Sequence, residues 1–379
     1  MKKQSHFSVS PTKFQKKIYK IIAWINVLFI IALLAAYLST IVNPSQFVWL
    51  AYFGMAFPVI FIGNIVLTLF WIAAKSKLFL YSLILLLFGF EFIGRTIQFN
   101  PVNLFRNPDS NHYSLMSFNV RMFDKYNWIA DTNTENKILA YIQKQNPDIL
   151  CLQENFSSIT DGNVHKKIVE KLSYKYATNQ LAHNNIAIKA GTAIYSKHPI
   201  VNKGAIYTTE KRQIGLFADI VISTDTIRVY NFHLASVHLA AADYQALDSL
   251  VNGAEHLQFN NMHSIIRKLN KAFLIRSIQV EAMNMQLNNC PYEMLLCGDF
   301  NDTPVSYTYN QVPEKLNDAF KSSGFGFGTT YFSSFMAFRI DYIFHSGKIE
   351  VSNYRTHKIQ LSDHKPISIA FTLSYPDEF

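Results

Sequence analysis

The chain of 379 residues is longer than one ordinary domain, and its 49% hydrophobic content is enough for a large core and for membrane segments besides. Its net charge of +9 is concentrated at one end: residues 1–95 hold nine basic residues and one acid, a charge of +8, which leaves 9 − 8 = +1 for the rest. Because the remaining residues carry almost no net charge, the basic excess of the chain is not evidence for a nucleic-acid groove. The three cysteines, Cys151, Cys290 and Cys297, have no paired spacing and argue against a disulfide framework.

Apolar runs dominate the N-terminal quarter of the chain. The runs 19–42 and 47–74 are each long enough for a membrane span, which needs about 20 apolar residues. The run 78–94 is shorter and holds Glu91, so it fits either a third span or an interfacial helix. We therefore predict a membrane anchor of about three transmembrane helices over residues 18–96. A signal sequence is the alternative for the first run, but that run is too long for a typical signal core and more apolar runs follow.

The positions of the lysines predict the orientation of this anchor, because lysines gather on the cytoplasmic side of short membrane loops. They cluster in the basic tail of residues 1–17 and again at Lys75 and Lys77, whereas the turn 43–46 is uncharged. Three spans would place everything after about residue 96 outside the cytoplasm. The sequence thus predicts a multi-pass protein of the cytoplasmic membrane whose C-terminal domain lies outside the cytoplasm.

A linker rich in Asn and Pro, residues 97–112, precedes a domain that we predict to span residues 113–379. Short apolar runs that read as strands occur at 114–120, 149–153, 191–196, 217–222, 226–232, 294–297, 340–345 and 367–373. Residues 136–146 and 272–287 have apolar residues at helical spacing. Numerous strands with intervening helices predict a layered α+β domain. The polar stretch 236–267 reads as a helical insertion, either a solvated excursion or a lid on the substrate side.

Polar residues end or interrupt several predicted strands where a packed core would favour apolar side chains. They are Asn119, Glu154, His233, Asp299, Asn301, Asp341, Asp363 and His364. Acidic oxygen ligands with Asn and His suit a hard ion such as Mg²⁺ or Mn²⁺, which neutralises phosphate charge and activates water. Each residue alone is weak evidence, because a strand-end Asn is most often a turn residue. The prediction depends on these residues occurring together and in this order along the chain.

In order, the segments SFN, LQE, GDFN, RIDYI and SDH resemble the endonuclease/exonuclease/phosphatase family, from about Ser114 to Leu373. That family includes deoxyribonuclease-I-like nucleases, abasic-site endonucleases, inositol-polyphosphate phosphatases and neutral sphingomyelinases. The resemblance implies an α+β fold, a four-layer α/β/β/α sandwich of two sheets flanked by helices, with the site at one rim. In this chain the sandwich would follow the transmembrane helices.

The resemblance also implies metal ligands and residues that act on water. Glu154 would be the principal ligand of Mg²⁺ or Mn²⁺, with Asn119 beside it at the metal and the substrate, and Asp363 would add a further ligand. Asp299 and Asn301 would orient or deprotonate the attacking water and hold the scissile phosphate.

Histidines and arginines complete the implied site. His364, oriented by Asp341, would contact the phosphate, and His233 stands where the family places a proton donor or phosphate contact. Whether His238 shares that role stays open, with a structural role favoured. Two arginines close to the motifs would bind phosphate oxygens bidentately or else form surface salt bridges, namely Arg121 and Arg339.

These observations predict a membrane-anchored, metal-dependent hydrolase of phosphate esters, in which water attacks phosphorus. The substrate would be nucleic acid, a nucleotide or a phospholipid head group, and the near-neutral domain disfavours a dedicated DNA binder. The partners are this substrate and the membrane, with no obligate protein partner. One alternative is a phospholipase- or sphingomyelinase-like lipid phosphodiesterase. Another is an inactive membrane-tethered binding domain, which loss of a motif residue would have supported, and none is missing.

Overall fold

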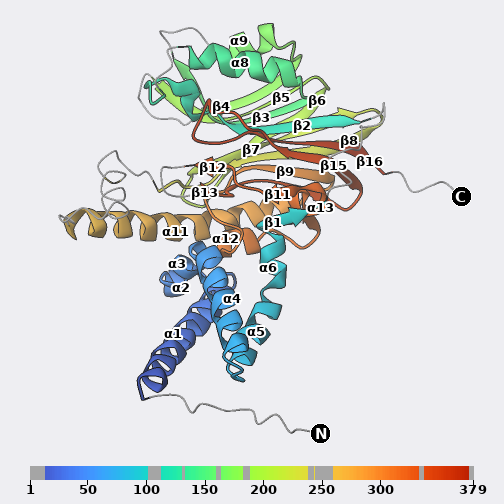
Figure 1. Ribbon diagram of the computed structural model, residues 1–379. Helices are drawn as coiled ribbons and strands as arrows, with labels where there is room; N and C mark the ends of the chain where they lie inside the picture. Colours follow the sequence, from blue (N-terminus) through green and yellow to red (C-terminus); the bar gives the residue numbers. More distant parts are fainter. Residues whose placement is uncertain are drawn as a thin grey trace, which may run out of the picture.

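The computed structural model describes residues 13–100, 112–129, 133–158, 164–181, 188–237, 243, 259–332 and 337–374. Figure 1 shows a bundle of N-terminal helices, the helical unit, next to a domain of stacked β-sheets, the sandwich domain. The long helix α11 (Phe259–Asn288) lies across the junction between the two.

The helical unit consists of α1 (Lys13–Leu38), α2 (Pro44–Phe47), α3 (Leu50–Met55), α4 (Phe57–Ala73), α5 (Phe79–Phe88) and α6 (Phe90–Gly94). Within the part of the chain that the structure describes, α1 is the one helix long and apolar enough to cross a membrane, with a mean hydropathy of 2.6. α4 and α5 are also apolar but have only 17 and 10 residues. A straight span needs about 20 residues, so α1 is the element that supports a membrane anchor.

The second and third predicted spans are each divided into shorter helices. The run 47–74 breaks between α3 and α4, because Pro58 stands in the first turn of α4, where a proline can begin a helix but cannot continue an earlier one. The run 78–94 breaks at Gly89, between α5 and α6. The multi-pass arrangement therefore stays a prediction.

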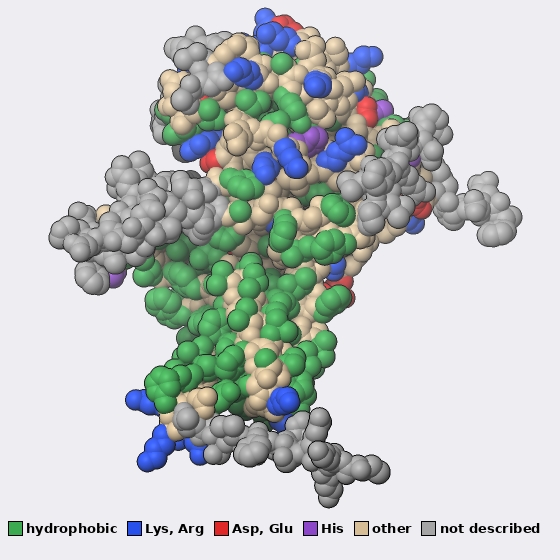
Figure 2. Space-filling view, in the orientation of Figure 1, with side chains coloured by type: hydrophobic (Ala, Val, Ile, Leu, Met, Phe, Trp, Pro, Cys, Tyr) green, Lys and Arg blue, Asp and Glu red, His purple; other side chains and the backbone are tan. Residues whose placement is uncertain are grey.

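Buried polar side chains join three helices of the helical unit. Trp71 of α4 donates its indole N–H to Asn26 Oδ1 of α1 at 2.9 Å, and Asn26 Nδ2 donates to Ser82 Oγ of α5 at 3.1 Å. Such hydrogen bonds hold apolar helices together where lipid provides no hydrophobic drive. Figure 2 shows hydrophobic side chains covering the visible face of the unit, with Lys and Arg gathered at its free end. Both features suit helices that pack in a membrane.

The sandwich domain contains two six-stranded sheets. The first has the order β15 (Ile349–Thr356), β16 (Ile367–Leu373), β2 (Tyr113–Asn119), β3 (Ile149–Ser158), β5 (Ile188–Ser196) and β4 (Tyr176–Leu181). The second has the order β10 (Leu316–Asp318), β14 (Asp341–Ser346), β9 (Glu293–Asp299), β8 (Asp225–His233), β7 (Gln213–Ile222) and β6 (Ile200–Tyr207). In each sheet the two central strands, β2 with β3 and β8 with β9, are parallel, and the other pairs are antiparallel.

Three layers of apolar side chains hold the four layers of backbone together. Between the sheets lies a core that includes Ile149, Val229 and Ile343. On the outer face of the first sheet, α8 (Thr134–Gln145) and α9 (Val164–Lys171) bury a second core. On the outer face of the second sheet, α11 and the short α12 (Tyr307–Asn310) bury a third. This arrangement confirms the predicted four-layer α/β/β/α sandwich.

The predicted strands and helices are present, with shifted ends. Each of the eight predicted strands overlaps one of the strands above, but the sequence reading missed β4, β6, β10 and β15. The remaining short elements are η1 (Arg121–Asp124), α13 (Ala319–Ser323), β12 (Tyr331–Phe332) and β13 (Ala337–Phe338). α11 begins at Phe259, well before the predicted start at residue 272, so the end of the predicted insertion 236–267 belongs to this helix. Residues 238–242 and 244–258 of that insertion lie outside the described residues.

The helical unit packs closely on the sandwich domain. A Cβ added to Gly54 of α3 would lie 2.2 Å from the carbonyl oxygen of Val305. Tyr52 donates its hydroxyl to Asn270 Oδ1 of α11 at 2.8 Å, and its ring meets that of Phe273 edge-on at 5.5 Å. The helical unit and the sandwich domain therefore share a tightly fitted interface.

A strand pair and a hydrogen bond from a side chain to the backbone extend this junction. β1 (Ile97–Phe99), which follows the helical unit, pairs antiparallel with β11 (Phe325–Phe327). Arg339 donates through Nη1 to the carbonyl oxygen of Arg95 at 2.8 Å. The predicted linker 97–112 thus begins as a paired strand, while its residues 101–111 lie outside the described residues.

Gly54→Ala is expected to lower the thermal stability of the full-length protein by about 1–3 kcal/mol, because the added methyl group overlaps the backbone of Val305 and the interface must open. The measurement is thermal unfolding in detergent. Gly94→Ala is the matched control: it is also a helical glycine, but the nearest atom to its added Cβ is a side-chain nitrogen at 3.5 Å. Equal unfolding midpoints for both variants and the wild type would contradict the close packing.

Candidate active site

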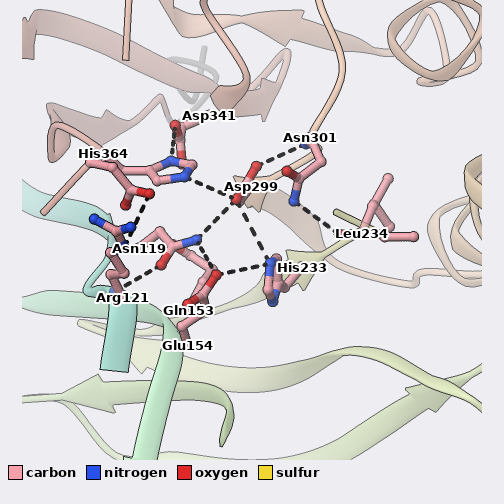
Figure 3. Close-up of polar contacts among 12 residues, drawn as sticks. Asn119, Arg121, Gln153, Glu154, His233, Leu234, Asp299, Asn301, Asp341 and His364 are labelled. Carbon is pink, nitrogen blue, oxygen red and sulfur yellow. Dashed lines mark hydrogen bonds and ion pairs between the residues drawn. The ribbon is translucent and has the colours of Figure 1, made fainter. Parts of the chain in front are cut away.

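The candidate site lies where the two pairs of parallel strands end, at one rim of the sandwich. In register, Asn119 at the end of β2 lies opposite Gln153 of β3, and His233 at the end of β8 lies opposite Asp299 of β9. The carboxyl ends of parallel strands share one edge of a sheet, so polar residues at these ends come together. Figure 3 shows the side chains converging from both sheets.

A kink in β3 turns Glu154 into the site. Glu154 has a φ of 50°, and the pairing of β3 with β5 shifts register between Leu152 and Asn155. Left-handed backbone is costly for a residue with a Cβ and often marks a functional position. Next to it, Gln153 is fully buried and donates to Asn231 Oδ1 at 2.6 Å, so the kink lets a core amide and a site carboxylate stand side by side.

Asn119 joins carboxylates that come from the two sheets. Its Nδ2 donates to Glu154 Oε1 at 3.3 Å and to Asp299 Oδ2 at 3.0 Å. Its Oδ1 accepts the backbone N–H of Arg121 at 3.0 Å, which fixes the orientation of the amide. The predicted neighbours Asn119 and Glu154 are therefore in direct contact.

Asp341 and His364 form the predicted pair. Their side chains are buried, and His364 Nδ1 lies 2.9 Å from Asp341 Oδ2. The other ring nitrogen of His364 lies 3.7 Å from Asp299 Oδ2. Burial by itself would lower the pKa of His364, but the carboxylates of Asp341 and Asp299 outweigh it and raise this pKa to about 10. The ring is thus an imidazolium whose Nε2–H faces the site.

Asp299 and Asn301 form the centre of the site. Asp299 accepts the backbone N–H of Asn301 on Oδ1 at 2.8 Å, and Asn301 donates Nδ2 to the carbonyl oxygen of Leu234 at 3.0 Å. Burial raises the pKa of the Asp299 carboxyl to about 6, although the positive charge of His364 opposes the shift. A carboxylate with a raised pKa is suited to accept a proton near neutral pH.

His233 presents a ring nitrogen without a hydrogen-bond partner among the described residues. Its Nε2 is buried and lies 3.8 Å from both Glu154 Oε1 and Asp299 Oδ2, too far for a hydrogen bond to either. Buried polar atoms are normally paired, so this nitrogen is suited to a group that enters the site, such as a phosphate oxygen or water. His238, which could share this role, lies outside the described residues.

Two groupings of these residues could hold a divalent cation. Ligand atoms of Asp299, Asp341 and His364 all lie within 4.8 Å of one another. Glu154 and Asn119 form the second grouping, in which Glu154 offers carboxylate oxygens, as Mg²⁺ prefers, whereas Asn119 now faces Glu154 with Nδ2 and would have to turn its amide. In the first grouping, Asp341 and His364 already use their facing atoms in the 2.9 Å hydrogen bond. The Glu154 carboxylate is therefore the ligand that a cation could reach without breaking that hydrogen bond.

Arg121 lies at the site. Its Nε is 3.3 Å from Asp363 Oδ2, and its guanidinium carbon lies 4.5 Å from the centre of the Trp128 ring. Both Arg121 and Asp363 line the cavity described below, so the predicted metal ligand Asp363 is an ion-pair partner of the predicted phosphate-binding arginine.

The prediction that Arg339 contacts substrate is wrong. Its side chain is 1% exposed, and its guanidinium forms an ion pair with Asp318 and donates to the carbonyl oxygen of Arg95. The side chain therefore points toward the junction with the helical unit, away from Asp341. The sequence could not reveal this orientation, because both partners of Arg339 are distant in the chain.

A cavity of about 350 Å³ opens beside these residues. Its lining includes the site residues Arg121, Glu154, Asn301, Asp363 and His364. It also includes residues that the sequence reading did not single out, namely Met55, Met122, Trp128, Leu269, Phe273, Arg276, Asp302, Phe338 and Ile340. Among these, Arg276 is 1% exposed and donates to Asp302 Oδ2 at 3.2 Å, which ties α11 to the loop after Asn301. No sequence motif indicates these lining residues, because they reach the cavity only through the tertiary packing of elements that are distant in the chain.

Comparison with known proteins agrees with this geometry. The model of the endonuclease/exonuclease/phosphatase family matches residues 116–364, and that of a domain of unknown function matches residues 19–96. No curated protein matches the chain.

Solved structures share the fold at low identity. An endonuclease/exonuclease/phosphatase from Beutenbergia cavernae is 16% identical, with a TM-score of 0.51 over 69% of this chain and 72% of its own. A family protein from Leptotrichia buccalis is 18% identical, with a TM-score of 0.49 over 69% of this chain and 100% of its own. The human Nocturnin catalytic domain with bound sulfate is 17% identical, with a TM-score of 0.49 over 69% and 95%. These likenesses concern the fold of the sandwich domain.

Proposed function

Because the chain belongs to the endonuclease/exonuclease/phosphatase family, we propose that it is a membrane-anchored, divalent-metal-dependent hydrolase of phosphate esters. The observation that carries the proposal is the convergence of side chains from six separate segments at the rim of the sandwich, beside one cavity. These side chains are Asn119, Glu154, His233, Asp299, Asn301, Asp341 and His364. A purely structural rim would not need two histidines and three carboxylates so close together.

Glu154 and Asn119 would hold the metal ion, with Asp363 available if it leaves Arg121. Mg²⁺ or Mn²⁺, when bound, neutralises phosphate charge and lowers the pKa of water. The Asp299, Asp341 and His364 grouping is less suitable, because binding there would break the hydrogen bond between Asp341 and His364.

The other residues would act on water and phosphate. Asp299, with its raised pKa, would accept a proton from the attacking water, and Asn301 would help to orient that water. The water oxygen bonds to phosphorus while the ester bond to the leaving oxygen breaks, and the leaving oxygen takes up a proton. His364, kept charged by Asp341, would donate to a phosphoryl oxygen whose charge grows in the transition state. His233 would bind a second phosphoryl oxygen through its free Nε2.

The anchor is part of the same proposal. α1 is long and apolar enough to cross the cytoplasmic membrane, and α4 and α5 would complete the anchor beside it. Lys75 and Lys77, exposed between α4 and α5, would lie on the same cytoplasmic side as the basic tail. The sandwich domain would then face away from the cytoplasm.

The full-length protein in detergent is expected to hydrolyse bis-p-nitrophenyl phosphate with Mg²⁺ or Mn²⁺, and to lose at least about a hundredfold in rate when EDTA removes the metal. Added metal should restore the rate and raise the unfolding temperature, because an ion bound only by the native state stabilises it. Activity that EDTA leaves unchanged would contradict metal dependence. If the protein bound metal but hydrolysed neither this diester, p-nitrophenyl phosphate, oligonucleotides nor phospholipids, it would be the inactive binding domain instead.

A further inference from the structure

The cavity at the candidate site is lined by side chains of two kinds. The polar side chains that would act on a phosphate, Arg121, Glu154, Asn301, Asp363 and His364, are together called the polar wall. The apolar side chains, which include Met55, Leu269, Phe273, Phe338 and Ile340, are together called the apolar wall, and the ion pair of Arg276 with Asp302 also lines the cavity. A site for a phosphate alone, or for a polynucleotide read through its backbone, has no need of such an apolar wall.

The apolar wall is continuous with the helical unit. Met55 is the last residue of α3, which lies between the apolar helices α1 and α4 of that unit. Phe273 of α11 also contacts this segment, since its ring meets the Tyr52 ring edge-on at 5.5 Å. The anchor therefore contributes directly to the lining of the cavity, in addition to tethering the domain.

The surface around this junction has the composition of a membrane interface. On α11, Leu274, Ile278 and Met285 are 39%, 41% and 60% exposed and lie on one face of the helix, which also carries the exposed Arg267, Lys271 and Glu281. A helix with an apolar stripe and basic residues is typical of one that lies in the plane of a bilayer surface. In Figure 1, α11 runs across the end of the α1–α4 bundle, as an interfacial helix would.

Exposed aromatic residues also lie next to this junction. Phe47, Trp49 and Phe53, on and between α2 and α3, are 53%, 52% and 37% exposed. Aromatic side chains gather where membrane proteins cross the boundary between lipid and water. The segment that carries them ends at Met55, so the cavity lies at the level of this boundary.

We propose that the substrate is a membrane phospholipid of the leaflet next to the sandwich domain, a proposal that rests on the hydrolase function proposed above. Its phosphate would lie against the polar wall, and its acyl chains would lie along the Met55 and Phe273 side toward the bilayer. Water would bond to the phosphorus, one of the two P–O ester bonds would break, and the released alkoxide would take up a proton. The products are an alcohol and a phosphomonoester.

A pair of water-soluble diesters with one head group tests this proposal. Dihexanoylphosphatidylglycerol, kept below its micelle concentration, carries two short acyl chains, and glycerophosphoglycerol carries none. With Mg²⁺ and the full-length protein, kcat/KM for the acylated diester is expected to be at least about tenfold higher, which the burial of about two methylene groups would supply. Both diesters are measured with the same protein in the same detergent, and the variants below distinguish a preference set by the cavity lining from partitioning of the acylated diester into micelles.

Met55→Gln keeps the length of the side chain and makes the apolar wall polar, so the ratio of the two kcat/KM values should fall toward one. Leu269→Gln provides a second variant on α11 in case the first does not fold. Val201→Gln is the matched control, because Val201 is 61% exposed on β6, and it should leave the ratio at the wild-type value.

The possible outcomes separate the two proposals. Equal or lower kcat/KM for the acylated diester, or a preference for an oligothymidylate over it, would overturn the lipid proposal while the hydrolase function stands. A ratio unchanged in both folded Gln variants would also overturn it. Failure to hydrolyse even bis-p-nitrophenyl phosphate with either metal would overturn the hydrolase function itself.

Discussion

Glu154→Gln is expected to reduce metal-dependent hydrolysis of phosphate esters by about three orders of magnitude or more while the protein stays folded. The carboxylate stands on a kink of β3 with 26% of its side chain exposed, so it contributes little to packing. Its loss would remove the main ligand of an ion that supplies several kcal/mol of transition-state stabilisation. The measurement is kcat/KM on bis-p-nitrophenyl phosphate with Mg²⁺.

Thermal unfolding separates this role from a structural one. Without metal, Glu154→Gln should be as stable as the wild type or more stable, because the neighbouring carboxylate of Asp299 loses a like charge nearby. The stabilisation by added Mg²⁺ should disappear. Glu350→Gln, at an exposed position of the edge strand β15, is the control and should keep both activity and the metal effect. An unfolded or fully active Glu154→Gln protein would show that Glu154 is not the metal ligand.

Asp341→Asn is expected to lower kcat by about two orders of magnitude and to change KM less. Asn keeps the shape of the buried side chain, but it removes the charge that holds His364 protonated at a distance of 2.9 Å. An imidazolium that stabilises charge in the transition state is commonly worth about 3 kcal/mol, or roughly a hundredfold in rate. Because the contact strengthens mainly in the transition state, substrate affinity should suffer less.

The double variant tests whether the two residues act as one unit. Asp341→Asn combined with His364→Ala should be scarcely slower than His364→Ala alone, since residues that act together show non-additive losses. Steady-state kinetics on the wild type, both single variants and the double variant gives the coupling free energy between Asp341 and His364. Losses that simply multiply would mean that Asp341 and His364 act separately despite their hydrogen bond.

Much of the site was predictable from sequence because its residues sit at the ends of strongly apolar strands. The pattern placed Asn119, Asp299 and Asp341 at strand ends. The parallel pairs bring Asn119 and Asp299 to one rim, and the antiparallel pairing of β14 with β9 places Asp341 opposite Asp299. The kink at Glu154 was not predictable, since β3 continues through the polar residues after it. The orientation of Arg339 was also hidden, because its partner Asp318 is fixed only by tertiary packing.

The helical unit shows a different limit. Counting apolar residues gave two runs of spanning length and a shorter third, but where a helix breaks depends on local features such as Pro58 in the first turn of α4. Sequence patterns also gave no sign that Met55 reaches the cavity, since an apolar residue in an apolar run reads only as lipid-facing or buried. Packing between the two parts of the chain decided that position.

The pairing of β1 with β11 has a consequence for the order of events during synthesis. Ile97 pairs with Phe327, 230 positions later in the chain (327 − 97 = 230). At a translation rate of about 5–20 residues per second, the ribosome needs roughly 10–50 s to make the partner strand after Ile97 has emerged. During that time the interface around Gly54 and β1 has no partner to pack against. The nascent protein is therefore exposed to unwanted strand pairing and to proteases until its last third has been made.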